Sequence, residues 1–528
     1  MHVVTGGRSP RSTRIGMRCE DEPAHSPALL ITLDRVSSPV PPLAALHRAR
    51  DAALAELRAG LPVLAEAAKV FGRAGHEVDL VGGSVRDAIL GRDVVDLDFA
   101  TDARPEQMVE LLRPWADSVW DVGARFGTVG ADKDGMRLEF TTYRSDVYDP
   151  DSRKPEVAYG GDLLSDLGRR DFTVNAMAVR LDDGKFIDPF DGLLDLALKR
   201  LRTPGSAEAS FSDDPLRMMR AARFASQLGM TVEPEAIDAM ARMAQRIDMI
   251  SAERVRDELV KLVMSPSPRA GLQLLVDTGL CERFLPELPA LSLEIDEHHR
   301  HKDVYEHTLT VLEQAIALES THDPVLAPDF VLRFAALMHD VGKPRTRRLE
   351  PGGGVSFHHH EIVGAKITRK RMRALRFDTR TTDDVCQLVA LHLRFHGYGG
   401  GDWTDSAVRR YARDAGDQVV RLHKLTRADC TTRNRRKAAA LQRTYDNLES
   451  RINELAQAEE LAAVRPDLDG NAIMAILGVG PGRVVGQAYN FLLELRLENG
   501  PMSAQEAQAA LLSWWEQQEP GSADTTDR

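Results

Sequence analysis

Apolar and polar positions alternate with two different periods along this chain, and the change of period divides the sequence. Between residues 43 and 74 apolar side chains recur every three or four positions, which predicts a pair of amphipathic helices. Strand patterns follow within residues 78–190, mixed with helical ones, and beyond Leu194 helix follows helix. The predicted strands are residues 78–81, 96–98, 125–129 and 136–143, with a hairpin that ends at residues 188–192.

Other stretches lack these periods. Residues 1–42 are rich in Ser, Pro, Arg and Gly, so we expect a disordered extension there, and a disordered tail at residues 516–528. The polar segment from Arg144 to Gly161 predicts a mobile loop. A histidine-rich region begins near His298, which places a domain boundary between about residues 288 and 298.

Residues 80–101, LVGGSVRDAILGRDVVDLDFAT, carry the first candidate chemistry. Asp96 and Asp98 lie two positions apart on a predicted strand, so both point to one side while Leu97 points into the core. Two carboxylates on one side repel each other unless a cation lies between them. Oxygen ligands of this kind suit Mg²⁺, which completes its shell with water and substrate phosphates.

The glycine turn before these carboxylates suits a phosphate group. Gly82 and Gly83 let the backbone come close to an anion, and the helix that starts near Ser84 offers free N–H groups. Arg86 adds a positive charge. The stretch therefore predicts a site for a metal-bound triphosphate, although a D-x-D pair alone is common on solvated strands.

A second candidate pair is Asp214 and Arg217, three positions apart on a predicted helix and so expected on one face. Ser212 or Asp213 suits the N-cap of that helix, and Pro215 suits its first turn. An aspartate accepts hydrogen bonds and an arginine donates them, so together they can imitate the edge of a base. An ordinary surface ion pair is the alternative.

Three segments of the chain resemble motifs of class II tRNA nucleotidyltransferases and bacterial poly(A) polymerases, and they occur in the same order. They are residues 80–101, Arg169-Arg170-Asp171-Phe-Thr-Val-Asn175, and Asp213-Asp214-Pro-Leu-Arg217, where the family has glutamate in place of Asp213. The resemblance implies catalysis by Asp96 and Asp98 with two Mg²⁺ ions. Glu139, on a later predicted strand, is a candidate third carboxylate, with an ordinary solvated strand residue as the alternative. It also implies nucleotide binding by Gly83, Arg86, Arg170, Asp171, Asn175, Asp214, Arg217, Arg220 and Arg223.

A third candidate combines His307, the adjacent pair His339-Asp340, and Asp429. The pair ends an apolar run that predicts a helix, and imidazole with carboxylate suits Mn²⁺, Ni²⁺, Fe²⁺ or Zn²⁺. A capping or surface role for the pair is the alternative. The order of these residues resembles the HD superfamily of metal-dependent phosphohydrolases, which implies a divalent transition metal at His307, His339, Asp340 and Asp429, with His360 and His392 as candidates for a second metal.

The composition of the chain indicates in which compartment the protein works and which partners suit it. The 528 residues contain four scattered cysteines without a C-x-x-C pair, and no apolar run has the length of a membrane span. We therefore expect a cytoplasmic protein without a membrane partner. The net charge of −12 argues against indiscriminate nucleic-acid binding. Local basic faces that suit phosphate are Lys366, Arg369, Lys370 and Arg373, and Arg433, Arg435, Arg436 and Lys437.

The resemblance implies an α+β protein whose nucleotidyltransferase head, with a small mixed sheet, precedes an all-α neck, body and HD region. The expected segments are a head at 43–200, a neck and body at 201–292, an HD domain at 293–460 and a helical segment at 461–515. The implied activity is addition of C, C and A to the 3′ end of tRNA from CTP and ATP. Alternatives are a poly(A) polymerase, an enzyme that adds only CC or A, or an HD phosphohydrolase whose head only binds nucleotide or RNA.

Overall fold

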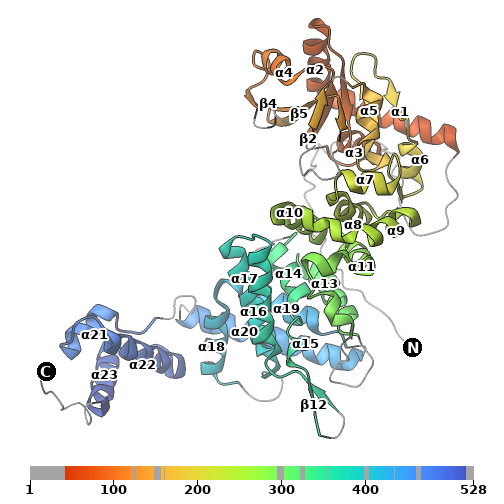
Figure 1. Ribbon diagram of the computed structural model, residues 1–528. Helices are drawn as coiled ribbons and strands as arrows, with labels where there is room; N and C mark the ends of the chain where they lie inside the picture. The colour runs from red at the N-terminus through yellow and green to blue at the C-terminus, as the bar shows by residue number, and fades with distance from the viewer. Residues whose placement is uncertain are drawn as a thin grey trace, which may run out of the picture. The chain divides into compact units, whose positions relative to one another are not determined.

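The computed structural model describes residues 42–518 except for 95, 122, 124–126, 148–155, 160, 294–302, 322–326, 352–353, 398–402, 433 and 460–464. The chain divides into two compact units (Figure 1). The head unit takes the described parts of Met1–Ser145, Val157–Leu167 and Asn175–Leu193, and the helical unit takes the rest. The predicted disordered extension up to residue 41, the tail from residue 519 and Arg433 lie outside the described residues.

The head unit confirms the predicted helix pair and the mixed pattern that follows it. Its helices are α1 (Leu43–Gly60), α2 (Pro62–Arg73), α3 (Gly83–Ile89), α4 (Pro105–Leu112) and α5 (Leu163–Gly168). Its main strands are β1 (Val78–Val81), β2 (Asp96–Thr101), β3 (Ser118–Trp120), β4 (Thr128–Lys133), β5 (Met136–Thr142), β8 (Ala178–Arg180) and β9 (Phe186–Ile187).

These seven strands form one sheet in the order β3-β4-β5-β2-β1-β8-β9. Strands β2 and β5 run parallel, and their neighbours pair antiparallel, so the sheet is mixed as predicted. The parallel pair needs a crossover, which α4 and the β3-β4 hairpin supply between β2 and β5. The two parallel strands at the centre carry Asp96, Asp98 and Glu139.

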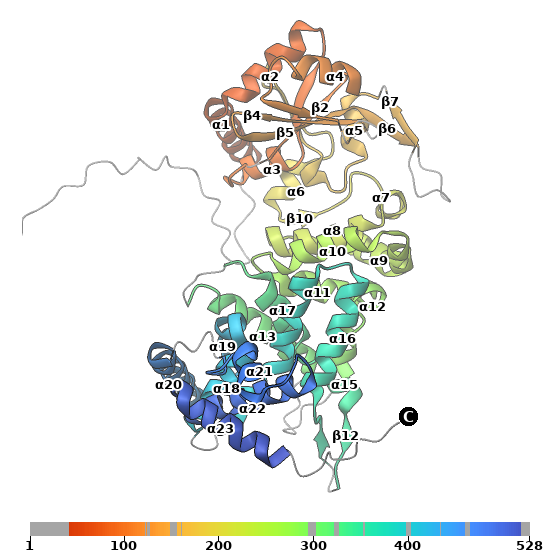
Figure 2. The ribbon, with the colours of Figure 1, turned by 90° about the vertical axis from the view of Figure 1, so that its left-hand side faces the viewer.

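One face of the sheet is apolar and covered by helices α2 and α4 (Figure 2). Phe99 of β2 stacks on Phe140 of β5 with ring centroids 4.5 Å apart, and Phe140 stacks on Phe71 of α2 at 5.1 Å. All three rings are buried. Because side chains alternate between the two faces of a strand, burial of Phe99 and Phe140 turns Asp98 and Glu139 to the opposite face.

The predicted mobile loop is wrong at its ends. Arg144–Val147 forms strand β6 and Glu156–Tyr159 forms strand β7, and the two make a separate two-stranded sheet. The segment is polar and shows no clear period, so sequence patterning alone did not reveal strands that pair mainly with each other. Most residues between them lie outside the described part of the chain.

The helical unit confirms the prediction that helices follow Leu194. They are α6 (Gly192–Ala197), α7 (Ala207–Asp213), α8 (Leu216–Leu228), α9 (Pro234–Met243), α10 (Ala252–Val263), α11 (Pro268–Asp277), α12 (Leu280–Phe284), α13 (Val304–Leu318), α14 (Phe330–Met338), α15 (Lys343–Thr346), α16 (His360–Ala374), α17 (Thr379–Leu391), α18 (Asp405–Ala415), α19 (Val419–Asp429), α20 (Arg435–Glu459), α21 (Gly470–Leu477), α22 (Arg483–Asn499) and α23 (Ala504–Gln518). Two short strand pairs accompany them: parallel β10 (Arg200–Leu201) with β11 (Thr231–Val232), and antiparallel β12 (Arg348–Leu349) with β13 (Val355–Ser356).

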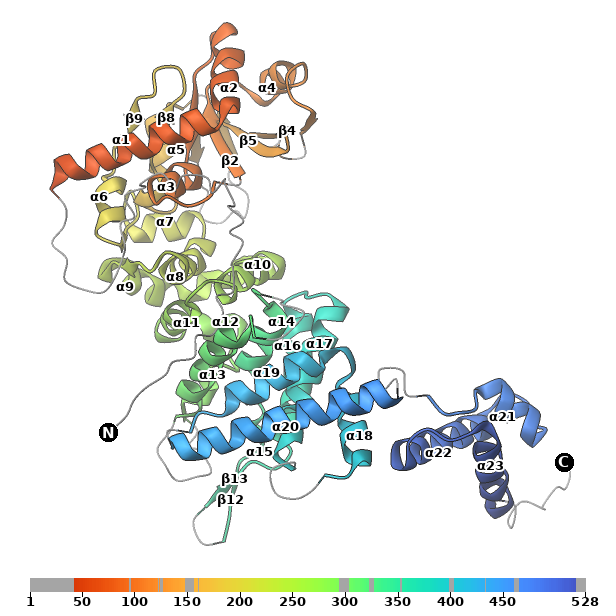
Figure 3. The ribbon, with the colours of Figure 1, turned by 180° about the vertical axis from the view of Figure 1, so that it is seen from behind.

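Helices α13, α14, α16, α17 and α19 pack together in the helical unit (Figure 3). The turn after α14 comes very close to the start of α16, since a Cβ built on Gly342 would lie 2.0 Å from the His360 carbonyl oxygen. Only glycine therefore fits there. None of the described helices has the length and apolar character that a bilayer crossing requires.

A buried arginine joins α14 to the end of α10. The side chain of Arg333 is almost fully buried, and its Nε and Nη2 donate to the two carboxylate oxygens of Glu319 at 2.6 and 2.8 Å. Its Nη1 donates to the carbonyl oxygens of Val263 and Ser265 at 2.9 and 2.8 Å. These carbonyls lack helical partners at the C-terminus of α10, so one guanidinium satisfies a buried carboxylate and a helix end.

Replacing Arg333 with Ala should lower the free energy of unfolding by ~3–5 kcal/mol, because Glu319 would remain as an uncompensated buried charge. Thermal unfolding followed by circular dichroism measures the shift of the transition. A matched control is Arg410→Ala, which removes exposed ion pairs to Glu494 and Glu498 and should change stability by less than about 1 kcal/mol. Equal effects of the two substitutions would contradict the assigned role.

Candidate functional site

The head unit brings three predicted carboxylates onto two adjacent strands. The parallel register sets Asp98 opposite Glu139 and Asp96 opposite Arg137. Asp98 and Glu139 are partly exposed and Asp96 is exposed, so all three remain accessible on the face away from the aromatic stack. Arg137 Nη2 lies 3.5 Å from Glu139 Oε1. This face therefore carries three carboxylates on two adjacent strands.

Sequence reasoning did not identify the residue that joins the glycine turn to the carboxylate strand. The Ser84 hydroxyl donates to the Asp96 carbonyl at 3.0 Å and accepts from the Asp98 N–H at 3.1 Å. Gly82 precedes it with φ of +71°, a conformation that favours glycine, and its N–H donates to the Met177 carbonyl. The first turn of α3 is thereby fixed against β2, next to both aspartates.

Arg86 and Asn175, both predicted to bind nucleotide, contact each other directly. Arg86 is 5% exposed, and its Nη1 donates to the Asn175 side-chain oxygen at 2.5 Å. Its Nε donates to Asp87 at 2.9 Å, and Nη2 donates to the other oxygen of Asp87 at 2.6 Å. The guanidinium is therefore held in one orientation close to Gly83, which lies in the same turn.

The structure corrects the predicted N-cap of α8. Ser212 and Asp213 belong to the preceding helix α7, whose last residue is Asp213, and Asp214 follows with an extended backbone. Pro215 precedes the first residue of α8, and the N–H of Leu216 donates to the Asp214 side chain at 3.1 Å, so Asp214 holds the start of the helix from just outside it. Asp214 and Arg217 are thus not neighbours on one helix face: Asp214 stands before the helix and Arg217 lies in its first turn.

Arg217 points back toward α7 and is 8% exposed. Its Nη1 donates to the Ser210 hydroxyl at 2.9 Å and to the Ser210 carbonyl at 3.3 Å, while Nη2 donates to the Arg169 carbonyl at 2.5 Å. The carboxylate of Asp214 accepts from Arg254 of α10 at 2.8 Å. Both members of the predicted base-reading pair are therefore held by residues that the sequence analysis did not single out.

Arg220 and Arg223 bind carboxylates of the helical unit. Asp171, which is 7% exposed, accepts from Arg220 Nε at 2.7 Å, and Glu258 of α10 lies 2.7 Å from Arg223 Nε. Glu258 is buried and also lies 3.7 Å from Arg220. Arg170, in the same segment as Asp171, is partly exposed. The predicted phosphate contacts of these arginines stay predictions.

The histidine and aspartate residues of the third candidate converge from five helices. His307 lies on α13, His339 and Asp340 follow α14 directly, His360 begins α16, His392 follows α17 and Asp429 ends α19. Their ligand atoms form two groups, and within each group all lie within 4.8 Å of one another. The first group is His307, His339 and Asp429, and the second is Asp340, His360 and His392.

Asp340 lies between these two groups. One of its oxygens is 3.2 Å from His339 Nε2, and the other is 3.3 Å from His360 Nε2. His307 Nε2 is 2.9 Å from the Asp429 carboxylate. Lys343 donates to Asp340 at 2.9 Å, which is the one lysine contact to either group among the described residues. Gly342 makes this arrangement possible, because it lets the turn that bears Asp340 approach α16.

The ring orientations of the histidines suit metal binding. The Nδ1 atoms of His339, His360 and His392 each bond a backbone carbonyl three residues earlier, at 2.8, 2.8 and 2.7 Å. A carbonyl accepts, so each Nδ1 carries a proton, and in the neutral form of each ring the lone pair lies on Nε2. These three Nε2 atoms are buried without a hydrogen bond within the described structure. Buried acceptors that converge in this way fit a divalent transition metal.

Charge differs among these imidazoles. Burial lowers the pKa of His339, but the charges of Asp340 and Asp429 outweigh burial and raise it to about 9. Burial, with the neighbouring charge of His339, lowers the pKa of His392 to about 3. Burial disfavours the charged form of Asp429, yet the surrounding imidazoles hold its pKa well below the usual range. The carboxylates are therefore in the form that binds a cation.

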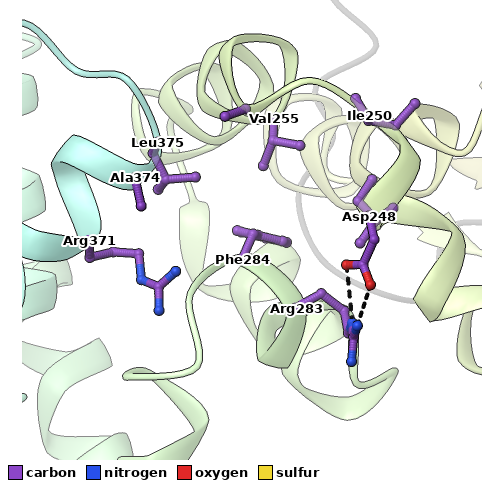
Figure 4. Close-up of a pocket in the computed structure, with 10 residues that line it drawn as sticks. Asp248, Ile250, Val255, Arg283, Phe284, Arg371, Ala374 and Leu375 are labelled. Carbon is purple, nitrogen blue, oxygen red and sulfur yellow. Dashed lines mark hydrogen bonds and ion pairs between the residues drawn. The ribbon is translucent and has the colours of Figure 1, made fainter.

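A cavity of about 180 Å³ in the helical unit lies apart from the predicted residues (Figure 4). Part of its lining is apolar and includes Val255, Phe284 and Leu375. Its two arginines have carboxylate partners, since Arg283 pairs with Asp248 and Arg371 binds Glu287 through both Nε and Nη2. No predicted catalytic or metal-binding residue lines it, so its shape alone does not mark the site of the chemistry.

Three family models match consecutive parts of the chain. The poly A polymerase head domain matches residues 78–202, and the probable RNA and SrmB-binding site of polymerase A matches residues 229–291. The HD domain matches residues 304–434. The second and third segments fall within the helical unit, and the third contains both groups of histidines and aspartates.

Among characterised proteins, the CCA-adding enzyme of Lactobacillus johnsonii is 43% identical over 225 residues, which is 42% of this chain and 54% of that enzyme. The chain thus spans about half the length of the relatives of this kind that it matches. The A-adding tRNA nucleotidyltransferase of Deinococcus radiodurans is 33% identical over 449 residues, which is 84% of this chain and 96% of that protein.

Solved structures share the fold. The CCA-adding enzyme of Bacillus stearothermophilus, in complex with CTP, superimposes with a TM-score of 0.59 at 24% identity over 86% of this chain and 98% of that chain. The Thermotoga maritima CCA-adding enzyme, complexed with tRNA, gives a TM-score of 0.55 at 16% identity over 86% of this chain and 95% of that chain. The predicted α+β fold, a head with a small mixed sheet followed by helices, is confirmed.

Proposed function

Because the chain belongs to the family of tRNA nucleotidyltransferases and poly(A) polymerases, we propose that it adds C, C and A to the 3′ end of tRNA. The substrates are CTP and ATP, and the leaving group is pyrophosphate. One observation carries this proposal: the register that sets Asp98 beside Glu139, on the sheet face that also bears Asp96. A tRNA substrate places the reaction in the cytoplasm.

These carboxylates fit Mg²⁺, because all donors are oxygens and none of the three side chains is fully buried. Asp96 and Asp98 would hold two Mg²⁺ ions, which would lower the pKa of the RNA 3′-hydroxyl and stabilise charge on the leaving oxygen. Glu139 adds negative charge next to Asp98. Ser84 keeps both aspartates in place through their backbone, so the strand does not have to rearrange during transfer.

We assign triphosphate binding in the head to Gly83 and Arg86. Asn175 supports this role by fixing the guanidinium of Arg86, which leaves a rigid donor near the glycine turn. In the helical unit, Arg170 is assigned to phosphate and Asp171 to the ribose, while Arg220 and Arg223, which pair with Asp171 and Glu258, are assigned to phosphate or the flanking nucleotide.

Nucleotide choice is assigned to Asp214 and Arg217. The exocyclic amino groups of cytosine and adenine are hydrogen-bond donors, whereas uracil and guanine have carbonyl oxygens at the corresponding positions. An aspartate accepts from the first kind of base and repels the second, and an arginine donates to the adjacent ring nitrogen. The protein thereby replaces a nucleic-acid template.

Addition of A alone is a second candidate for the transfer reaction. The relative that aligns over 84% of this chain is named an A-adding enzyme, whereas the CCA-adding relatives align over about half of their length. All of these reactions use the same carboxylates and pyrophosphate release. They differ only in which nucleotides follow one another on the same RNA.

A second activity, phosphohydrolysis, is proposed for the HD region. Two groups of donors, four of them buried, support it, together with three Nε2 atoms that have no hydrogen bond within the described residues. A divalent transition metal such as Mn²⁺, Ni²⁺, Fe²⁺ or Zn²⁺ at His307, His339, Asp340 and Asp429 would acidify a bound water to a nucleophile near neutral pH. His360 and His392 provide ligands for a second ion. A 2′,3′-cyclic phosphate at an RNA end is the proposed substrate.

Replacing Asp98 with Ala should abolish nucleotide transfer, a loss of at least about 1,000-fold, because the metals supply several kcal/mol of transition-state stabilisation. Binding of tRNA, measured by gel shift, should persist. The control is Asp117→Ala, which removes an exposed carboxylate of the head that pairs with Lys133. Incorporation near the wild-type rate by the Asp98 variant in Mg²⁺ would refute the assignment of the site.

Replacing Asp340 with Ala should remove the metal and the phosphohydrolase activity together, since Asp340 lies between both donor groups. Elemental analysis and hydrolysis of RNA with a 2′,3′-cyclic phosphate measure the two effects. Nucleotide addition should stay near the wild-type rate, because the head carboxylates belong to the other unit. A metal-free wild type would reject the site, and bound metal without hydrolysis would leave only a structural role.

A further inference from the structure

We propose that Ser210 and Arg254, which lie outside the Asp-x-x-Arg motif, position Asp214 and Arg217 and thereby determine the discrimination between nucleotides. The inference rests on the proposed function, in which Asp214 and Arg217 read the incoming base. Ser210 lies on α7 and Arg254 on α10, so the base-reading pair is held from two sides by different helices.

Ser210 contacts both members of the pair. Its carbonyl oxygen accepts from the Asp214 N–H at 3.2 Å and from Arg217 Nη1 at 3.3 Å. Its hydroxyl accepts from the same Nη1 at 2.9 Å. Ser210 is 7% exposed and Arg217 is 8% exposed, so these bonds are shielded from water. A single residue therefore fixes the backbone of the acceptor and the side chain of the donor.

The contact with Ser210 sets the orientation of the Arg217 guanidinium. Nη1 is fixed by Ser210, and Nη2 is fixed by the Arg169 carbonyl at 2.5 Å. A guanidinium is planar and rigid, so two fixed nitrogen atoms set the direction of its remaining N–H bonds. In the family motif a glutamate occupies the position of Asp213, one methylene longer. Here the orientation of Arg217 is provided by Ser210 and the carbonyl of Arg169.

Arg254 performs the corresponding task for Asp214. Its Nη2 donates to one carboxylate oxygen at 2.8 Å, and the Leu216 N–H donates to the other at 3.1 Å. Both oxygens are thus held, and each keeps a further lone pair for a base amino group. Arg254 sits in the first turn of α10, where the Ser251 hydroxyl accepts its N–H. This hydrogen bond at the start of the helix fixes the backbone from which the Arg254 side chain extends.

This arrangement predicts a loss of discrimination when either contact is removed. An amino group of cytosine or adenine is accepted only if the carboxylate oxygen points at it, and a carbonyl oxygen of uracil or guanine is repelled only under the same condition. A mobile Asp214 or Arg217 adapts to both kinds of base. The preference for CTP over UTP, and for ATP over GTP, therefore falls even if the fold and the metal-binding carboxylates are unchanged.

The test compares Ser210→Ala and Arg254→Ala with wild type in single-nucleotide incorporation on tRNA lacking its 3′ end. The ratio of kcat/KM for CTP to that for UTP, and for ATP to that for GTP, should fall about 10-fold or more in each variant. The loss should appear mainly as a higher KM for CTP and ATP. Arg217→Ala provides the upper limit of the effect, and Arg254→Lys should restore part of the ratio.

Two matched controls separate positioning from stability. Ser226→Ala removes a buried hydroxyl of the next helix, α8, which bonds Gly271 and Pro268. Arg242→Ala removes an exposed ion pair to Glu208 on α7. Both controls should keep the wild-type ratios, whatever their thermal stability.

Unchanged ratios in Ser210→Ala and Arg254→Ala would overturn the inference, and so would equal losses in the two controls. A wild type that transfers no nucleotide to RNA would instead overturn the proposed function, on which the inference depends. The two failures are therefore distinguishable in one set of assays.

Discussion

The account depends on one constraint, the parallel pairing of β2 with β5 in a single register. Burial of Phe99 and Phe140 against Phe71 fixes which face of each strand is apolar, and the alternation of side chains then places Asp98 and Glu139 on the other face. A slip of one residue would bury the carboxylates and expose the aromatic rings. The packing of the aromatic core therefore keeps these carboxylates together on one face of the sheet, where a cation can bind them.

The helical unit follows a related principle, in which charged groups are oriented by buried partners. Arg217 is fixed by carbonyl and hydroxyl oxygens, and Glu258 holds Arg223. In the HD region His339, His360 and His392 are each oriented by a backbone carbonyl, so the Nε2 atom of each ring faces the other members of the site. Functional side chains that are held in this way lose little further freedom when a ligand binds.

The sequence predicted the parts of this arrangement that depend on short-range pattern. Helix and strand periods located β2, β5 and the helices after Leu194, and the two-residue spacing of Asp96 and Asp98 predicted their common face. Strands β6 and β7 were missed, because the polar segment that contains them shows no regular alternation of apolar and polar residues. The N-cap of α8 was misplaced, since Ser212 and Asp213 satisfy the capping pattern and only the structure shows that they belong to the preceding helix. Ser84, Ser210 and Arg254 carry no sequence signal of their own, because their partners are set by tertiary packing.

The most direct test of the central claim is the sequence of the product. A tRNA that ends at the nucleotide before CCA is incubated with the protein, Mg²⁺ and all four nucleoside triphosphates, and the new 3′ ends are sequenced. The account predicts that C, C and A are added in this order and that addition then stops. Runs of A on any RNA, or RNA ends that remain unextended, would contradict it.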